Sequence, residues 1–264
     1  WDAESDEAPS QDVYSALTKD MMVAVEEKAH TRLGSRLNYE TTGISSLFRK
    51  SGRAVDDFGE TYTDQFVALD PAWEDPAVWA ELMGDGGAAD APFRMNDDIA
   101  DVLPATADAY RDFAATIAAV DGDDPRAEQP WHTVYLALYE DLSNSPDVTI
   151  DGPQGGLVAA AASSVGGFTA EDLRAAFVDV DEDWASPEVW KTIQTYSPAF
   201  TSGYFLNSVD RQKGVDGSEW RPDDQRIYLT LLWRTMLMSL TITCSCILLG
   251  YPVAWLLANL SVRS

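Results

Sequence analysis

Cysteine is almost absent from this sequence of 264 residues, and the two copies stand close together near the C-terminus. They are Cys244 and Cys246, so residues 1–225 contain none. Disulfide bonds, reactive thiols and zinc–thiolate sites are therefore excluded from the larger part of the chain. That part is nevertheless long enough to form a hydrophobic core of its own.

Basic residues are also scarce, with 18 Lys and Arg against 44 Asp and Glu, for a net charge of −26. Contacts with phosphate need Lys and Arg, so nucleic acid and anionic lipid are not expected partners of residues 1–225. Small cations such as polyamines suit this charge. The favoured interpretation is simpler, because an acidic surface keeps a protein soluble and is also a common adaptation to salt.

The charge is distributed unevenly along the chain. Residues 226–264 contain no Asp or Glu, and their only basic residues are Arg226, Arg234 and Arg263. Residues 1–225 hold all 44 acidic residues but only 15 of the 18 basic ones, which gives them a net charge of −29. A change this sharp indicates two physical environments.

Motifs for catalysis, metals or cofactors are not found. His30 and His132 have no neighbouring motif partners, and the glycines at 84–87 lack the Lys that completes a nucleotide-binding loop. The acidic runs at 121–124 and 179–183 lack the spacing of a calcium-binding EF-hand. The sequence therefore predicts no enzyme activity, no cofactor and no metal site.

One long apolar run stands in the acid-free part. Met236–Leu260 comprises 25 residues without a formal charge, whereas about 20 suffice to cross a bilayer. Gly250 and Pro252 lie inside the run, and both residue types are commoner in membrane helices than in soluble ones. We expect a transmembrane helix here rather than a buried core helix, with a soluble domain over residues 1–222 and a membrane segment over 223–264.

The orientation of this helix follows from its basic flank. Arg263 lies just beyond the apolar run, so the positive-inside tendency puts the C-terminus in the cytoplasm and residues 1–225 outside it. The segment that begins at Trp1 has neither the basic nor the apolar region of a signal peptide. We therefore expect a further segment before Trp1 to direct export.

The same region carries a family resemblance. Its most specific parts are Arg234-Thr235, Ser239 and the stretch Leu249–Trp255, which contains Gly250-Tyr251-Pro252. Residues 227–264 resemble the second membrane span of permeases in the spermidine/putrescine class of ABC importers. The preceding stretch Tyr204–Asp210 is similar to members that carry a long insert between spans one and two.

The resemblance implies a piece of an importer permease in the bacterial inner membrane, with residues 1–225 in the periplasm. It also implies a second permease subunit, ATP-binding subunits, and an extracytoplasmic solute-binding protein that the insert docks, unless the insert guards solute entry instead. The transported solute would be small, and a polyamine is one candidate. The alternative is a single-span membrane receptor or sensor with an extracytoplasmic ligand-binding domain.

The acidic part contains two pairs of similar segments. Val13–Asp20 and Val134–Asp141 share the pattern V-Y-x-A-L-x-x-D, and Phe66–Trp79 and Phe177–Trp190 share F-V-x-[LV]-D-x-x-W-x-x-P-x-V-W. The pairs occur in the same order, which predicts two structural repeats, at about 11–112 and 131–222, related by a pseudo-twofold axis.

Apolar residues recur at helical spacing through most of the acidic part. We therefore expect an all-α, mostly helical fold, a duplicated domain followed by one transmembrane helix. The expected helices cover residues 12–32, 45–55, 98–120, 133–142 and 169–178. A short strand at 147–150 is one possibility, and the Gly- and Ala-rich stretch 152–167 forms either a loop or a weak helix.

The repeated segments supply the candidate binding residues, which are Asp70, Trp73, Trp79, Asp181, Trp184 and Trp190. Aromatic walls beside a carboxylate suit a cationic amine, through cation–π attraction and ion pairing. The favoured interpretation assigns these residues to the core of the fold, since Trp packs, Asp caps the next helix and Pro begins it.

Overall fold

The chain folds into two compact units, of which the first extends to Ile193 and the second runs from Gln194 to Ser264. A computed structural model describes residues 7–38, 41–87, 91–198, 203–214, 217–223 and 226–259. The sequence predicts a boundary at residue 222. The second unit begins earlier because a short helix and a β-hairpin group with the long C-terminal helix.

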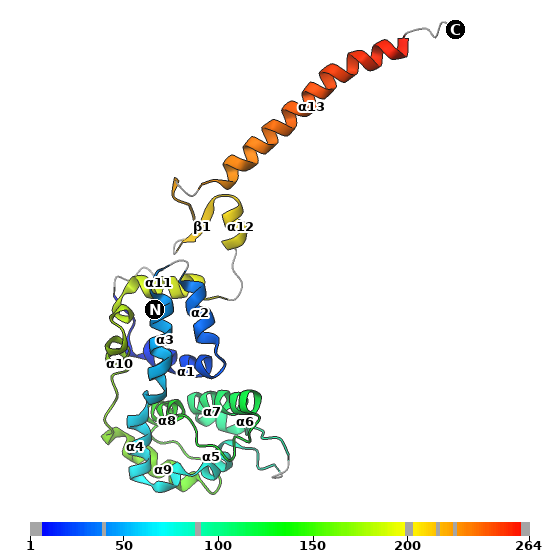
Figure 1. The fold of residues 1–264 in the computed structure, drawn as a ribbon. Coiled ribbons are helices and arrows are strands. Elements are labelled where there is room, and N and C mark those ends of the chain that lie inside the picture. The colour runs from blue at the N-terminus through cyan, green and yellow to red at the C-terminus, as the bar shows by residue number, and fades with distance from the viewer. Residues whose placement is uncertain are drawn as a thin grey trace. The chain divides into compact units, whose positions relative to one another are not determined.

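The prediction of a mostly helical chain is confirmed (Figure 1). The helices up to the unit boundary are α1 (Gln11–Glu26), α2 (Ala29–Leu37), α3 (Ile44–Ala54), α4 (Glu60–Leu69), α5 (Pro76–Met83), α6 (Asp97–Val102), α7 (Pro104–Thr116), α8 (His132–Asn144), α9 (Gly155–Ser164), α10 (Leu173–Val180) and α11 (Pro187–Tyr196). Short turns of 3₁₀ helix join several of them, namely η1 (Val55–Asp57), η2 (Pro71–Glu74), η4 (Val165–Gly167) and η5 (Glu182–Ala185), and the π-helical turn η3 (Ile117–Asp121) follows α7.

Several local predictions need correction. The helix expected over 169–178 begins only at Leu173, because Asp172 is its N-cap, and the helix expected over 98–120 is divided at Leu103, before Pro104. The single helix expected over 12–32 is broken at Lys28, whose φ of 55° is left-handed, and this break lets α2 turn and pack along α3. Residues 147–150 form no strand, because they leave α8 through a turn. The stretch 152–167 contains a regular helix, α9, so the helical interpretation of it was the better one.

Helix α8 lies at the centre of the first unit, where it contacts α4, α7 and α9. All of its residues from Thr133 to Leu138 are buried, so α8 has no face directed to solvent over this stretch. Such a helix is hydrophobic all round rather than amphipathic. Much of the surrounding core is aromatic, and Tyr14, Tyr110 and Tyr135 are fully buried in it.

The second unit combines α12 (Gly203–Ser208), an antiparallel hairpin of β1 (Arg211–Gly214) and β2 (Gly217–Trp220), and the long helix α13 (Tyr228–Asn259). Asp210 joins the hairpin to α13, because its carboxylate oxygens accept hydrogen bonds from the backbone N–H groups of Tyr228 at 2.9 Å and Leu229 at 2.7 Å. A carboxylate at this position satisfies otherwise unpaired N–H groups and interacts favourably with the helix dipole.

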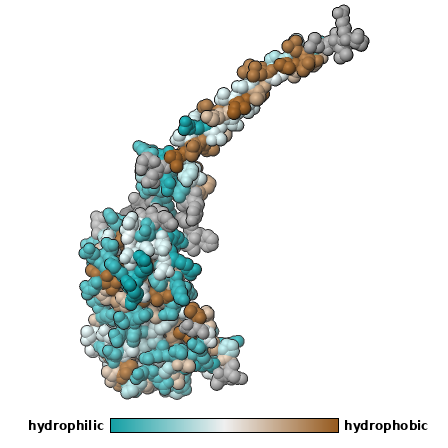
Figure 2. All heavy atoms as spheres, viewed as in Figure 1, coloured by the Kyte–Doolittle hydropathy of each residue, from teal (hydrophilic) through white to brown (hydrophobic). Residues whose placement is uncertain are grey.

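Helix α13 differs from every helix of the first unit because none of its described side chains is buried. Figure 2 shows hydrophobic residues along its length, whereas hydrophilic residues dominate the visible surface of the first unit. Within the described residues it is the one helix long and apolar enough to cross a membrane.

Candidate functional site

The two Asp/Trp segments adopt nearly the same conformation. Asp70 (φ −150°, ψ 121°) and Asp181 (φ −160°, ψ 123°) each cap a short 3₁₀ turn, where the carboxylate accepts a hydrogen bond from the N–H group two residues on. A second helix begins at Pro76 or Pro187. Proline suits this first helical position, so the local sequence accounts for both turns.

The four tryptophans of these segments pack as two equivalent pairs. Trp79 donates its indole N–H to the carbonyl of Trp73 at 2.9 Å, and Trp190 donates to the carbonyl of Trp184 at 2.8 Å. Their ring centroids lie 5.1 Å and 5.3 Å apart, with interplanar angles of 55° and 54°. All four are buried, and none of them lines the cavities described below. Their burial fits the core interpretation, and a ligand-binding role for them stays a prediction.

Each tryptophan pair is completed by a tyrosine from the other half of the sequence. The hydroxyl of Tyr14 donates to the carbonyl of Trp184 at 2.7 Å, and that of Tyr135 donates to the carbonyl of Trp73 at 2.6 Å. These tyrosines occupy the same position in the two V-Y-x-A-L-x-x-D segments. The two halves therefore exchange contacts, and neither Trp pair is enclosed by its own half alone.

One contact breaks this correspondence. The indole N–H of Trp184 donates to the hydroxyl of Ser51 at 2.7 Å, whereas the buried indole N–H of Trp73 has no hydrogen-bond partner among the residues that the structure describes. The turns η1 and η4 match in conformation, and they align Ser51 with Ala161. Alanine has no side-chain acceptor, so the hydroxyl of Ser51 has no equivalent at residue 161.

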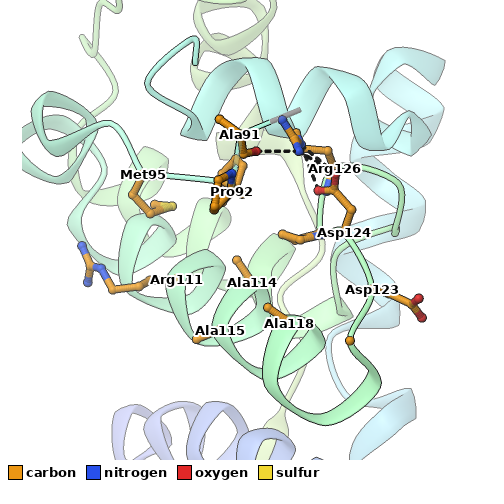
Figure 3. Close-up of a pocket in the computed structure, with 13 residues that line it drawn as sticks. Ala91, Pro92, Met95, Arg111, Ala114, Ala115, Ala118, Asp123, Asp124 and Arg126 are labelled. Carbon is orange, nitrogen blue, oxygen red and sulfur yellow. Dashed lines mark hydrogen bonds and ion pairs between the residues drawn. The ribbon is translucent and has the colours of Figure 1, made fainter. Parts of the chain in front are cut away.

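A cavity of about 530 Å³ lies beside α7 (Figure 3). Ala114, Ala115 and Ala118 form an apolar side, and the charged lining residues other than Asp123 are already paired. Figure 3 shows Arg126 bonded to both Asp124 and the carbonyl of Ala91. The hydrogen bonds from Arg126 lower the pKa of Asp124. Arg111 pairs likewise with Asp108, so this cavity offers a ligand little uncompensated charge.

A second cavity of about 520 Å³ is acidic and lies where α1, α4, α8 and the start of α10 meet. Its charged lining residues are Asp12, Glu140, Glu171, Asp172 and Arg174. Tyr62 and Tyr139 also line it, with stacked rings whose centroids are 4.5 Å apart. Carboxylates outnumber cations here, so the arrangement favours a positively charged ligand.

Glu171 is a partly buried carboxylate of this acidic cavity. Its carboxylate accepts a hydrogen bond from the N–H group of Gly59 at 3.0 Å, but no basic residue among the described ones pairs with it. Burial raises its pKa, and the nearby Glu60 raises it further. Glu140, by contrast, pairs with Lys19 at 2.7 Å and accepts from Ser15. Sequence reasoning missed Glu171, because the spacing of residues along the chain does not reveal which carboxylate becomes buried in the folded structure.

The most specific residues of the family resemblance lie on α13. Arg234, Gly250, Tyr251 and Pro252 are exposed, and the helix continues through Pro252 without interruption. The two cysteines lie on the same helix and are free thiols.

Within the described ranges, no group of three or more His, Cys, Asp or Glu residues could hold a metal ion. The chain was compared with known protein families, with curated proteins and with solved structures, and none of them matches it.

Proposed function

We propose that this chain is a piece of an ABC importer permease, in which an acidic helical domain lies outside the cytoplasm and α13 is one of the membrane spans. The observation that carries the proposal is the exposure of α13. Its 32 residues correspond to a helix of about 48 Å, which exceeds the roughly 30 Å of a bilayer core. Lipid or partner helices would cover side chains such as Leu248 and Leu249, which are 73% and 75% exposed.

The polar side chains of α13 are compatible with a lipid environment. The hydroxyls of Thr241, Thr243 and Ser245 each donate to the carbonyl four residues earlier, at 2.7 to 2.8 Å. A polar group without a partner is costly in the hydrocarbon region, and this back-bonding removes that cost.

We further propose that the acidic domain is an internal duplication. The paired Asp caps, the paired Trp–Trp contacts and the reciprocal tyrosine bonds support it, because unrelated segments would have to reach the same geometry independently. In the permease this domain would dock the solute-binding protein or guard solute entry in the periplasm. The remaining importer subunits are those that the family resemblance implies.

A small cationic amine, such as a polyamine, is the solute class that suits this domain. The support comes from the acidic cavity, where the half-buried carboxylate of Glu171 lacks a cation. A thermal-shift titration of the chain with putrescine, spermidine and a neutral osmolyte tests this. We expect a saturable stabilisation by the amines that E171Q removes and D70N retains. Equal shifts for both variants would place the amine elsewhere.

Membrane insertion is tested with the two native cysteines. In membranes from cells that produce the chain, Cys244 and Cys246 should resist a membrane-impermeant maleimide until detergent is added. Ser163 is exposed on α9, so S163C in a cysteine-free background should react without detergent. Labelling of Cys244 and Cys246 in intact membranes would contradict the proposal.

The permease and the receptor differ in the part of the gene beyond α13. Further membrane spans after Ser264 support the permease, whereas a signalling domain there supports the single-span receptor.

A further inference from the structure

The hairpin before α13 gathers a group of arginines around one tryptophan. The guanidinium of Arg211 lies 5.2 Å from the ring centroid of Trp220, and that of Arg226 lies 5.6 Å from it. Arg221 follows Trp220 directly and donates its backbone N–H to Asp210. We refer to Arg211, Trp220, Arg221 and Arg226 as the juxtamembrane cluster.

Two arginines of this cluster lack the partners that a chain rich in carboxylates could supply. The Nε groups of Arg211 and Arg221 are shielded from solvent and have no hydrogen-bond acceptor in the described part of the chain. Neither guanidinium forms an ion pair within the described ranges, although the chain contains 44 acidic residues. Of the neighbouring carboxylates, Asp210 is engaged with the N-terminus of α13, and Asp223 pairs with Arg226 at 2.7 Å. Glu219, two residues before Arg221, forms no ion pair with either arginine among the described residues.

A buried N–H donor without an acceptor is unfavourable, and a guanidinium matches the oxygens of a phosphate particularly well. The unpaired Arg211 and Arg221 thus point to an anionic ligand, which departs locally from the expectation set by the overall acidic charge of residues 1–225. Trp220 adds a second feature, because its indole is 53% exposed. Tryptophan is enriched where a protein meets the headgroup region of a bilayer.

The location of the cluster identifies the source of the phosphate. Arg226 stands two residues before α13, and Asp210 bonds the hairpin to the first turn of that helix. Once α13 is inserted, the cluster lies at the membrane surface. We propose that the juxtamembrane cluster binds the phosphate headgroup of an anionic phospholipid, and this inference rests on the proposed insertion of α13.

Native mass spectrometry of the full chain in detergent tests the inference, with phosphatidylglycerol and phosphatidylcholine titrated separately. We expect preferential binding of phosphatidylglycerol, and R211Q/R221Q should weaken it about 25-fold, at about fivefold for each arginine. The matched control is R32Q/R53Q, which removes the same charge from exposed positions of the first unit and should bind as the unmodified chain does.

A single variant distinguishes loss of lipid binding from local misfolding of the hairpin. Arg211 donates to the carbonyl of Ser218 and so contributes to the hairpin, whereas the side chain of Arg221 makes no hydrogen bond within the described residues. R221Q alone should therefore weaken phosphatidylglycerol binding about fivefold while leaving the hairpin intact.

Three results would overturn the inference: unchanged binding by R211Q/R221Q, equal binding of the two lipids, or displacement of phosphatidylglycerol by inorganic phosphate at equal concentration. The cysteine-labelling experiment separates these results from failure of the proposed function. A chain whose Cys244 and Cys246 are protected, but whose lipid binding ignores the arginines, keeps its membrane span and loses only the headgroup site.

Discussion

Lys19 and Glu140 occupy the same position in the two V-Y-x-A-L-x-x-D segments, and they form an ion pair with each other, Nζ to Oε2, at 2.7 Å. Equivalent residues meet in this way only beside the axis that relates two copies. The contact thus supports a local twofold relationship between α1 and α8. At this position one of the two segments carries a basic residue and the other an acidic one.

The Lys19–Glu140 pair should contribute modestly to stability, because both side chains are about one quarter exposed, at 26% and 29%. A double-mutant cycle with K19M and E140Q should give a coupling free energy of about 0.5–1 kcal/mol in urea unfolding. The exposed Asp108–Arg111 pair, three residues apart on one helix, is the control and should give about 0.3 kcal/mol. A coupling below that of the control would contradict a structural role for the pair.

The hydrogen bonds from Tyr14 and Tyr135 to the tryptophan carbonyls should make similar contributions to the free energy of unfolding. Y14F and Y135F each remove one buried hydrogen bond to a tryptophan carbonyl and should lower the free energy of unfolding by about 1 kcal/mol or more. Y135F also removes the acceptor of a longer bond from the indole of Trp79, at 3.2 Å, so its loss should be at least as large as that of Y14F. Y110F is a matched control, because the hydroxyl of Tyr110 is buried without a partner. Its removal should be neutral or stabilising. A loss for Y110F as large as that for Y14F would show that the hydrogen bonds are not the cause.

The unpaired indole of Trp73 offers a direct test of the duplication. If Ala161 is the counterpart of Ser51, A161S supplies the missing acceptor and should stabilise the chain by about 1 kcal/mol. S51A should have the opposite effect and cost about 1–3 kcal/mol, because it leaves the indole N–H of Trp184 unpaired. A serine at the exposed Ala160 serves as a control for the change of residue type. Destabilisation by A161S would argue that the two halves are not aligned at this position.

The pH dependence of stability should carry the signature of Glu171. Burial raises the pKa of this carboxyl in the folded state above its ordinary value of 4.5, so the folded chain holds the proton more tightly than the unfolded chain does. The stabilising contribution is complete below the unfolded pKa and is lost as the pH rises through the folded one. E171Q should therefore stabilise the chain at pH 7, and this gain should shrink as the pH falls toward about 4.

Urea unfolding at several pH values measures this effect, with D12N, an exposed carboxyl of the same cavity, as the control. Burial also raises the pKa of Asp20 and of Asp112, so part of the wild-type pH dependence should remain in E171Q. If the stabilisation by E171Q grew as the pH fell, the pKa of Glu171 would not be raised in the folded state, and the prediction would be wrong.

Local sequence patterns predicted much of the fold. The Asp and Pro residues near Trp73 and Trp184 specify their turns through short-range hydrogen bonds, and the spacing of apolar residues identified most of the helices. The hydrogen bond from Tyr14 to the carbonyl of Trp184 could not be predicted from the sequence. The carbonyl of Trp73, in the same half as Tyr14, is a chemically identical acceptor. The hairpin was also missed, although Asp216-Gly217 is a recognised turn signal, because its strands have only four residues each.

The candidate site was less predictable than the fold. Asp70 and the tryptophans were candidates because they occur in both repeated segments. Residues that recur in this way are expected where the fold itself requires them for packing and capping. Glu171 has no counterpart motif, and its importance comes from burial among residues distant in sequence, such as Gly59. The cluster around Trp220 depends on cross-strand pairing with Arg211, which appears only once the hairpin is formed.

The exchange of tyrosines between the halves also determines the order in which the domain can be built. Tyr14 cannot form its native hydrogen bond until Trp184 has been synthesised, 170 residues later. The N-terminal half consequently leaves the ribosome without the means to close its own core, and contacts of such long sequence separation form slowly. A chain that stays open until its second half arrives is well suited to translocation across a membrane before it folds.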